Sequence, residues 1–403
     1  FVEPSYPHIT VLTRQSTILF ENHLLPLIPK NRENDLIYFE PTDDTAPVIG
    51  FNPFHLDEAD NLTQKAGEVY TIFERALGDL GVKMSTLFQN AAYALLQQPN
   101  ATILDLDPLL DPINPDYRRA LLENPNSDPQ TRRFWQRYDA STYYTTTYEP
   151  VINRLFEFFR PPLSKVFSVP NNAAMSELNA NRRILLANLG RLRGLQESLV
   201  GQLLIAQLQQ TLLQRDFQQE KDRIPYFCYI DEAQTYTNSE LALNALFTRA
   251  RKYKLGLILA TQNTANIPSQ LLSTIVGNAG TLICLQLSAQ DAPSFAKELR
   301  LMDTNNKLRP DILQNLKTGQ AITGIRNTFY PVRIPYIETT RDHRRTRALI
   351  ALSKENYGST PLPPPEIAET VQLPRSPRRT RPRRGTASAP PPDEKDDDII
   401  DIR

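Results

Sequence analysis

Cysteine is almost absent from this sequence: the 403 residues include only Cys228 and Cys284, each inside an apolar run. Two such cysteines exclude a framework of disulfides and favour a reducing, cytosolic compartment. Long apolar runs are also missing, because no stretch approaches the ~20 residues that a membrane-spanning helix needs. Charge of one sign is not in excess, since 45 lysines and arginines balance 45 aspartates and glutamates. The net charge therefore neither indicates nor excludes a nucleic-acid partner.

The spacings that are typical of several catalytic classes are missing as well. The four histidines, His8, His23, His55 and His343, are scattered without the spacing of zinc ligands. No serine or cysteine stands in the pattern of a nucleophilic triad. The sequence also contains no G-x-x-x-x-G-K-[ST] loop, which binds phosphate in many nucleoside triphosphatases. A triphosphatase site in this chain would need that loop from elsewhere.

What the sequence does contain is a series of buried-strand patterns. Continuous apolar runs occupy Arg182–Gly190, Tyr226–Asp231, Leu255–Gln262 and Thr281–Leu287, and helical patterns separate them. Apolar strands that alternate with helices of about 10 to 18 residues are typical of a parallel sheet covered on both faces. The sequence therefore predicts an α/β fold, and Gly319–Ile337 predicts a terminal β-hairpin.

Other parts of the chain have a different character. Short β-rich runs open it, at "FVEP" and at Asp35–Asp43, whereas Asp57–Leu163 has helical spacing and reads as an all-α insertion. Glycine is scarce at 14 and proline abundant at 33, and beyond about Gly358 core-forming residues nearly vanish. We expect a disordered tail there, with an arginine-rich stretch and then an acidic one. The predicted domains are 1–56 and 176–345 for the sheet, 57–175 for the insertion, and 346–403 for the linker and tail.

Adjacent carboxylates follow one of the buried strands, in "YFCYIDEAQ". Asp231 and Glu232 fit a Walker B strand, in which the first acid holds Mg²⁺ through water and the second polarises the attacking water. The alternative is an acidic pair that begins a helix and favours its dipole. Thr261 and Gln262 end the next strand and should reach the same sheet edge, where open α/β sheets bind ligands. Their alternative is an ordinary polar strand end.

Two further groups of residues have both a functional and a plain interpretation. Arg249, Arg251 and Lys252 lie near the end of the helix after the acids, where cations suit the helix dipole or act as an arginine finger. Tyr143, Tyr144 and Tyr148 have the chemistry to stack on bases, although an exposed loop or a helix contact is the plainer role.

Several of these motifs occur in an order that resembles a known family. "NDLIYFEPTD…IGFNPF", "RILLANLG", "YFCYIDEAQ", "ARKYKLGLILATQN" and "IVGNAGTLICLQL" follow one another as in the HerA/FtsK-type P-loop ATPases. The likeness is strongest to the conjugative coupling proteins of type IV secretion systems, the TraG/TraD-like family. It runs from Phe1 to about Thr340 and includes the helical insertion.

The resemblance implies a RecA-like motor domain with a helical insertion, which assembles into homo-hexameric rings that pump DNA with ATP and Mg²⁺. It assigns Asp231 to Mg²⁺ and the nucleotide, Thr261 to the nucleotide, Glu232 to the catalytic base, Gln262 to the sensor and Arg251 to the arginine finger. The DNA would be single-stranded, and relaxosome or secretion-channel proteins are further partners that the family implies.

The resemblance also implies a place for the missing phosphate loop. "FVEP" is similar to the strand that follows the Walker A motif in the family, so we expect the loop, and any membrane anchor, upstream of Phe1. The chain alone would then be inactive as an ATPase, and the parent protein would work in the cytoplasm, at the inner membrane. Two other interpretations stay open: a non-hydrolysing docking scaffold for secretion, and a HerA-like DNA-repair translocase.

Overall fold

The computed structural model describes residues 7–14, 17–56, 61–78, 80–125, 127–142, 146–170, 182–305, 307–325, 328–338 and 342–365. The chain divides into two units, Phe1–Ile367 and Ala368–Arg403. The second unit lies outside the described residues, and so does the predicted disordered tail from residue 366 onward. Within the described residues, no helix combines the length and the apolarity that crossing a bilayer requires.

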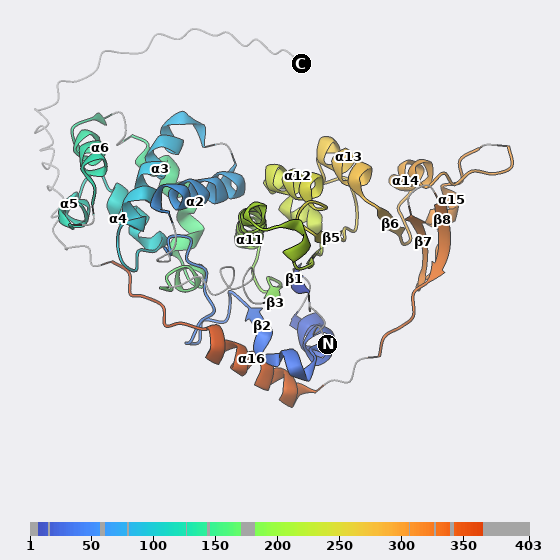
Figure 1. Cartoon of the computed structure of the whole chain (residues 1–403). Helices are drawn as coiled ribbons and strands as arrows, with labels where there is room; N and C mark the ends of the chain where they lie inside the picture. Colours follow the sequence, from blue (N-terminus) through green and yellow to red (C-terminus); the bar gives the residue numbers. More distant parts are fainter. Residues whose placement is uncertain are drawn as a thin grey trace, which may run out of the picture. The chain divides into compact units, whose positions relative to one another are not determined.

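A five-stranded sheet with the order β2-β3-β1-β4-β5 forms the centre of the first unit (Figure 1). Every neighbouring pair in this sheet is parallel, which confirms the predicted α/β class. The strands are β1 (His8–Thr13), β2 (Leu36–Phe39), β3 (Ile184–Asn188), β4 (Tyr226–Ile230) and β5 (Leu255–Leu259).

Strand β1 is a finding that the sequence analysis did not anticipate. We expected a strand at "FVEP", but residues 1–6 lie outside the described part, and the strand between β3 and β4 is His8–Thr13. Its buried face carries His8, Thr10 and Leu12, so two of three inward residues are polar. The Thr10 hydroxyl lies 2.6 Å from the Tyr226 hydroxyl across the sheet. Polar residues that are satisfied by a neighbouring strand hide the apolar alternation by which a strand is recognised.

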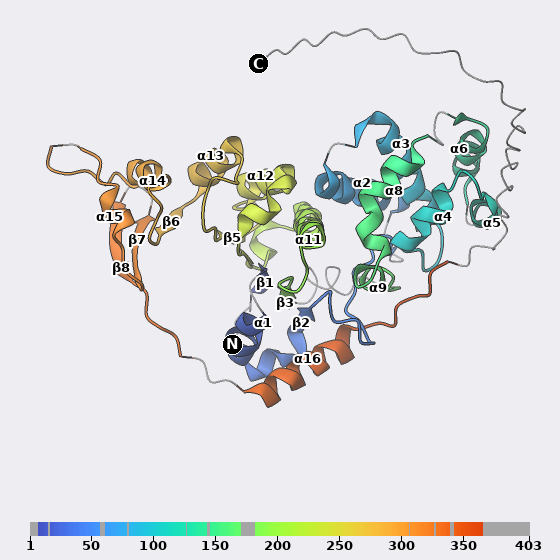
Figure 2. The same ribbon diagram turned by 180° about the vertical axis from the view of Figure 1, so that it is seen from behind.

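Helices fill the chain between β2 and β3, as the predicted insertion requires (Figure 2). They are α2 (Leu62–Leu77), α3 (Gly81–Leu96), α4 (Leu106–Leu110), α5 (Asp116–Glu123), α6 (Pro129–Asp139), α8 (Tyr148–Leu155) and α9 (Leu163–Val166), with short 3₁₀ turns at Ile103–Asp105 and Phe156–Phe159. Helix α2 packs on α11 (Leu195–Leu213), which follows β3. One hydrophobic core joins these helices to the sheet, so the insertion is not a separately packed body.

The sheet is covered unequally on its two faces. At β2 and β3, one face contributes Ile37 and Leu185 to the main core, and the other packs Tyr38 and Leu186 into a second cluster. The second cluster is built with η1 (Phe20–Leu24) and η2 (Leu25–Leu27), which follow α1 (Thr17–Leu19) and precede η3 (Lys30–Asp35). At β4 the same face is open, because Phe227 is 38% exposed.

Helix α16 (His343–Tyr357) also packs on β2, beyond the predicted boundary at residue 346 (Figure 1). Leu349 is buried there, and the Tyr38 backbone N–H donates to the Ser353 hydroxyl at 2.8 Å. Residues 346–357 are therefore helical rather than a linker. This helix was not predicted because polar and basic residues dominate it and its apolar stripe is narrow.

The end of the sheet domain forms a second sheet, in the order β6-β7-β8. It contains β6 (Thr281–Cys284), β7 (Gln320–Ile325) and β8 (Thr328–Arg333), with α14 (Ala292–Glu298) and α15 (Asp311–Gln314) between β6 and β7. The predicted hairpin is confirmed as the antiparallel β7–β8 pair. Strand β6 was expected in the parallel sheet, but it pairs antiparallel with β7. An apolar run indicates burial and does not name the pairing partner.

Titration of His8 gives a test of how β1 is buried. The ring is 1% exposed, stacks on Tyr226 with centroids 5.4 Å apart, and its Nδ1 atom has no hydrogen-bond partner. Burial, together with the positive charges of the nearby Arg215, Arg32 and Arg182, lowers the pKa of His8 to about 4. An unfolded histidine has a pKa of about 6.5.

Because the folded pKa is the lower one, the unfolded chain binds the extra proton first as the pH falls. The contribution of His8 to stability is complete above about pH 6.5 and should be lost progressively toward pH 4, by about 3 kcal/mol at most. Urea unfolding of the wild type and of His8→Phe at pH 5 and pH 7.5 measures this loss. A difference between the two proteins that is the same at both pH values would contradict the burial of a neutral His8.

Candidate functional site

The carboxyl ends of three neighbouring strands bring the predicted site residues together. Strand β1 ends at Thr13, β4 is followed by Asp231 and Glu232, and β5 by Thr261 and Gln262. The parallel register pairs Leu12 with Ile230 and Ile230 with Leu259, so the three strand ends are level. The sequence prediction that the acids and Gln262 share one sheet edge is consistent with this geometry.

The Asp231 carboxylate is oriented from two sides. The Thr13 hydroxyl donates to its Oδ2 atom at 3.0 Å, and the Glu232 backbone N–H donates to its Oδ1 atom at 3.0 Å. The Asp231 backbone N–H in turn donates to the Leu12 carbonyl at 2.9 Å. Asp231 is half-buried, so the ladder to β1 fixes its direction while part of the side chain faces solvent.

Glu232 occupies a strained backbone position. Its φ of +53° lies in the left-handed region, which residues other than glycine seldom adopt and which costs about 1–3 kcal/mol. The turn is closed behind it, because the Ala233 backbone N–H donates to the Ala260 carbonyl at 2.9 Å. The side chain is buried, and its Oε1 atom accepts from the Gln262 amide at 2.5 Å. The predicted base and the predicted sensor are therefore in direct contact.

Two residues at this edge escaped the sequence analysis, Thr13 and Gln234. Gln234 donates from Nε2 to the Oε2 atom of Glu232 at 2.5 Å, and its own Oε1 atom lies 2.7 Å from the Thr261 hydroxyl. Thr13 is the hydroxyl that orients Asp231. The position of Gln234, two residues after Glu232 in "DEAQ", was the available signal, but only the left-handed turn at Glu232 makes the two side chains face each other.

A further acid and an arginine lie beside these groups. Arg14 follows β1, and its Nε atom is 3.5 Å from Oε1 of Glu197, in the first turn of α11. Its Nη1 atom donates to the Thr235 hydroxyl at 3.3 Å. Burial raises the pKa of Glu197; the Arg14 guanidinium opposes that rise and the Glu232 carboxylate adds to it. The edge thus combines three carboxylates with one arginine, a surplus of negative charge that favours a cation.

Arg251 is not part of this group. Helix α12 (Glu240–Arg249) ends before it, and Arg251 lies exposed in the turn that precedes β5. It therefore stands at the amino end of β5, whereas Thr261 and Gln262 stand at the carboxyl end. The five residues of β5 span roughly 16 Å at about 3.3 Å per residue. Within one chain, the predicted arginine finger lies at the amino ends of the parallel strands and the predicted base at their carboxyl ends.

Of the three tyrosines considered for base stacking, the structure describes only Tyr148. Tyr143 and Tyr144 lie outside the described residues. The Tyr148 hydroxyl donates to Oδ1 of Asp107 at 2.6 Å, and the side chain packs against the main core. Tyr148 is therefore a helix contact, the plainer of its two interpretations.

Strand β5 is an edge strand of the parallel sheet. Among the described residues it pairs with β4 alone, so its other side carries unpaired backbone groups. The adjoining face exposes large apolar side chains: Phe227 at 38%, Tyr229 at 42% and Ile258 at 39%. An unpaired strand edge and exposed apolar side chains are features that commonly take part in contacts with other chain segments. This open edge lies directly beside the carboxyl end that carries Thr261 and Gln262.

The side chains at this sheet edge suit the Mg²⁺ ion of a magnesium–nucleotide complex, but not its phosphates. Mg²⁺ is usually held by one or two carboxylates, with waters and substrate phosphates completing its shell. Asp231, oriented by Thr13, fits that role. Among the described residues, no three acids, histidines or cysteines are placed so that they could hold a metal by themselves. The sequence has no glycine-rich phosphate loop, so it does not supply the backbone N–H donors that usually bind the phosphates. The residues present thus suit the cation and the attacking water.

Comparisons with known proteins bear on the fold. No family model matches the chain, and no curated protein matches it. Among solved structures, the bacterial conjugative coupling protein TrwBdeltaN70 in its unbound form has a TM-score of 0.55 at 12% identity, over 83% of this chain and 79% of that one. Plasmid coupling protein TrwB in complex with ADP and Mg²⁺ has a TM-score of 0.55 at 13% identity, over 84% and 81%.

The structure of a second protein, VirB4, matches as well. VirB4 of Thermoanaerobacter pseudethanolicus has a TM-score of 0.52 at 15% identity, over 82% of each chain. At such low identities the likeness establishes the fold alone. The chain therefore has the fold of the coupling protein TrwB and of VirB4, and the resemblance found in the sequence is confirmed at that level.

Proposed function

We propose that this chain is the larger part of an ATP-driven DNA translocase of the conjugative coupling type. The observation that carries the proposal is the contact between Glu232 and Gln262, beside an oriented Asp231, at the carboxyl edge of a sheet with the TrwB fold. Open parallel sheets bind ligands at this edge. A TrwB structure in complex with ADP and Mg²⁺ supports the same choice of ligands here.

In this proposal each residue has a distinct role. Asp231 holds Mg²⁺ through water, and Thr13 keeps its carboxylate in place. Glu232 accepts the proton of the attacking water. Gln262 and Thr261, which follow β5, contact the terminal phosphate of the nucleotide. When bound, Mg²⁺ neutralises the charge that develops on the phosphates.

The phosphate loop comes from outside these 403 residues in this proposal. The unpaired edge of β5 and the exposed side chains of Phe227 and Ile258 support a further strand and helix at this place. A strand that pairs with β5 would end level with Thr261, so a loop following it would face the site. We call the chain that carries such a strand, loop and helix before Phe1 the extended enzyme.

The position of Arg251 supports an assembly of several copies. Because it stands at the opposite edge of the sheet from Glu232, it can serve as an arginine finger only toward a neighbouring subunit. We propose a homo-hexameric ring with single-stranded DNA as cargo, working at the cytoplasmic face of the inner membrane with relaxosome or channel proteins. The rival is a non-hydrolysing docking scaffold, which the lack of a phosphate loop in the sequence favours.

ATP turnover separates the translocase from the scaffold. We expect the extended enzyme to hydrolyse ATP with Mg²⁺ and to be stimulated by single-stranded DNA. The 403-residue chain should be at least ~100-fold slower, because losing even one transition-state donor commonly costs ~10²–10³ in rate. A coupled phosphate-release assay on both proteins, with and without DNA, measures this. An extended enzyme that binds ATP without turnover would establish the scaffold, and Asp231-dependent turnover by the 403-residue chain would refute the placement of the missing loop.

A further inference from the structure

The carboxylate of Glu232 is held from two sides, and only one of these contacts belongs to the roles proposed above. Gln262 donates to its Oε1 atom and Gln234 donates to its Oε2 atom, each at 2.5 Å. A carboxylate with one donor can rotate about its last torsion, whereas two donors on different oxygens fix the plane of the group. The second donor, Gln234, has no role in the proposed chemistry.

The orientation of the Gln234 amide follows from its partners. Its nitrogen faces an acceptor, the Glu232 carboxylate, and its oxygen lies 2.7 Å from the Thr261 hydroxyl. Turning the amide over would place its oxygen against a carboxylate oxygen, a contact without a proton, so this assignment is the only satisfied one. The Thr261 hydroxyl lies at the same distance, 2.7 Å, from the Asn263 carbonyl, and its single proton serves one acceptor at a time.

The backbone that carries Gln234 is also held in place. It lies in η8 (Ala233–Ser239), and Tyr236 of the same segment is fully buried against α11. At Gly201 of α11 a Cβ atom would come within 2.1 Å of the Tyr236 ring, so the close approach of the two segments requires glycine there. Together with the left-handed turn at Glu232, this anchor points Gln234 back at the carboxylate.

We propose that Gln234 is a positioning residue for Glu232. With Gln262 it forms a pair of amides that holds the carboxylate in one orientation, and Thr261 fixes the Gln234 amide in turn. These contacts are present in the 403-residue chain itself. Their consequence for the rate rests on the proposed function, in which Glu232 must point at the attacking water.

The positional claim is tested on the 403-residue chain by NMR of ¹⁵N-glutamine-labelled protein. Gln234→Met keeps the length of the side chain and removes its donor. In this variant we expect the side-chain amide signals of Gln262, assigned with Gln262→Met, to shift, because the carboxylate is free to turn. Glu232→Ala should shift the amide signals of both glutamines, and the exposed Gln219→Met should remove only its own. Gln262 signals that stay unmoved in Gln234→Met, in a protein with wild-type melting, would overturn the proposal.

The consequence for catalysis is tested on the extended enzyme. Gln234→Met should lower kcat about 10- to 100-fold with little change in KM, since a small misplacement of a catalytic group can cost ~10²-fold. Glu232→Gln, assayed beside it, keeps two failures apart. Full activity of Glu232→Gln refutes the proposed base. An inactive Glu232→Gln beside a fully active Gln234→Met leaves the base in place and refutes the role of Gln234 in the reaction.

Discussion

Replacing Glu232 by glutamine in the extended enzyme should lower ATP turnover by about 10²–10⁴-fold, the range that a positioned general base contributes. The amide has the shape of the carboxylate but cannot accept a proton from water. It also disturbs the two contacts seen at this side chain, because the new NH₂ group would face one of the two amide donors of Gln234 and Gln262. Binding of ATP should persist, since neither contact involves the phosphates.

The measurement is steady-state turnover together with binding of a fluorescent ATP analogue. The exposed Glu220→Gln removes one negative charge from η7 (Glu220–Asp222) and should keep both turnover and affinity, which controls for net charge. Near-normal turnover of Glu232→Gln would make Asp231 and Glu232 a plain acidic turn after β4. Loss of nucleotide binding in the same variant would place Glu232 at the nucleotide itself rather than at the attacking water.

Mixing experiments extend this test to the ring. Arg251 and Glu232 stand at opposite ends of the strands, so in the proposed ring Arg251 acts as the arginine finger of the neighbouring subunit. Arg251→Ala should therefore also remove most turnover while sparing ATP binding. A mixture of Arg251→Ala with Glu232→Gln contains interfaces at which an intact Arg251 meets an intact Glu232, so some activity should return. Full activity of Arg251→Ala alone would reduce this arginine to an exposed charge in the turn before β5.

The sequence predicted those parts of the fold in which apolar residues settle the structure. Strands β3, β4 and β5 are continuous apolar runs bounded by polar segments, the pattern that is typical of strands in a parallel sheet. Strand β1 and helix α16 were missed partly because each buries a polar group that a distant partner satisfies. Thr10 meets Tyr226, and Ser353 meets the backbone of Tyr38. Such pairs are long-range, and local pattern does not encode them.

In the candidate site, too, local sequence pattern predicts the position of some residues but not of others. The placement of Asp231, Glu232 and Gln262 was predictable because each follows a recognisable parallel strand, and parallel strands end at one edge. Gln234 was not, because its contact depends on the left-handed backbone at Glu232, which no residue type in "DEAQ" requires. The same limit applies to Thr13, whose role required knowing that β1 lies next to β4.

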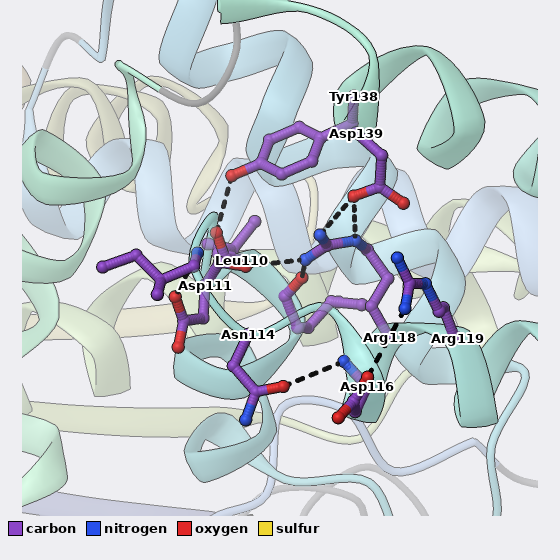
Figure 3. Close-up of polar contacts among 10 residues, drawn as sticks. Leu110, Asp111, Asn114, Asp116, Arg118, Arg119, Tyr138 and Asp139 are labelled. Atoms are coloured by element: carbon purple, nitrogen blue, oxygen red, sulfur yellow. Dashed lines mark hydrogen bonds and ion pairs between the residues drawn. The ribbon is translucent and has the colours of Figure 1, made fainter. Parts of the chain in front are cut away.

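Arg118 lies in α5 of the helical insertion, and its replacement should lower the stability of the fold. It is 1% exposed, and its guanidinium is enclosed by polar partners from α6 and from the end of α4 (Figure 3). Its Nη1 atom donates to the carbonyls of Leu109 and Asp111, at 2.7 and 3.1 Å, and its Nε atom donates to the Asp139 carboxylate at 3.1 Å. It also lies over the ring of Tyr138, 4.9 Å from its centroid.

These contacts tie α5 to the end of α4 and to the end of α6. The Tyr138 hydroxyl adds a further bond, donating to the Leu110 carbonyl at 2.6 Å (Figure 3). Removing the guanidinium leaves the buried Leu109 carbonyl and the partly buried Asp111 carbonyl without their donor, whereas the Asp139 carboxylate, 34% exposed, can turn to water. A buried acceptor that loses its donor costs about 1–3 kcal/mol.

We therefore expect Arg118→Ala to lower the free energy of unfolding by about 2–4 kcal/mol, through the two carbonyls that lose their donor. The neighbouring residue provides the control. Arg119 is 62% exposed and lies 3.5 Å from Asp116, so Arg119→Ala should change stability by no more than about 0.5 kcal/mol. Urea unfolding followed by circular dichroism compares the two. Equal midpoints for both variants would show that the enclosed guanidinium contributes no more than a surface charge.

The shape of that unfolding curve carries a second result. One hydrophobic core runs from the insertion helices into the sheet, with Trp135 of α6 and Leu203 of α11 in the same cluster. If this core couples them, Arg118→Ala shifts a single transition, and the sheet loses stability along with α5. A separate early transition would mean instead that α4, α5 and α6 unfold while β4 and β5 keep their structure. The glutamine NMR signals at the carboxyl edge would then stay unchanged through the first step, which decides between the two cases at the site itself.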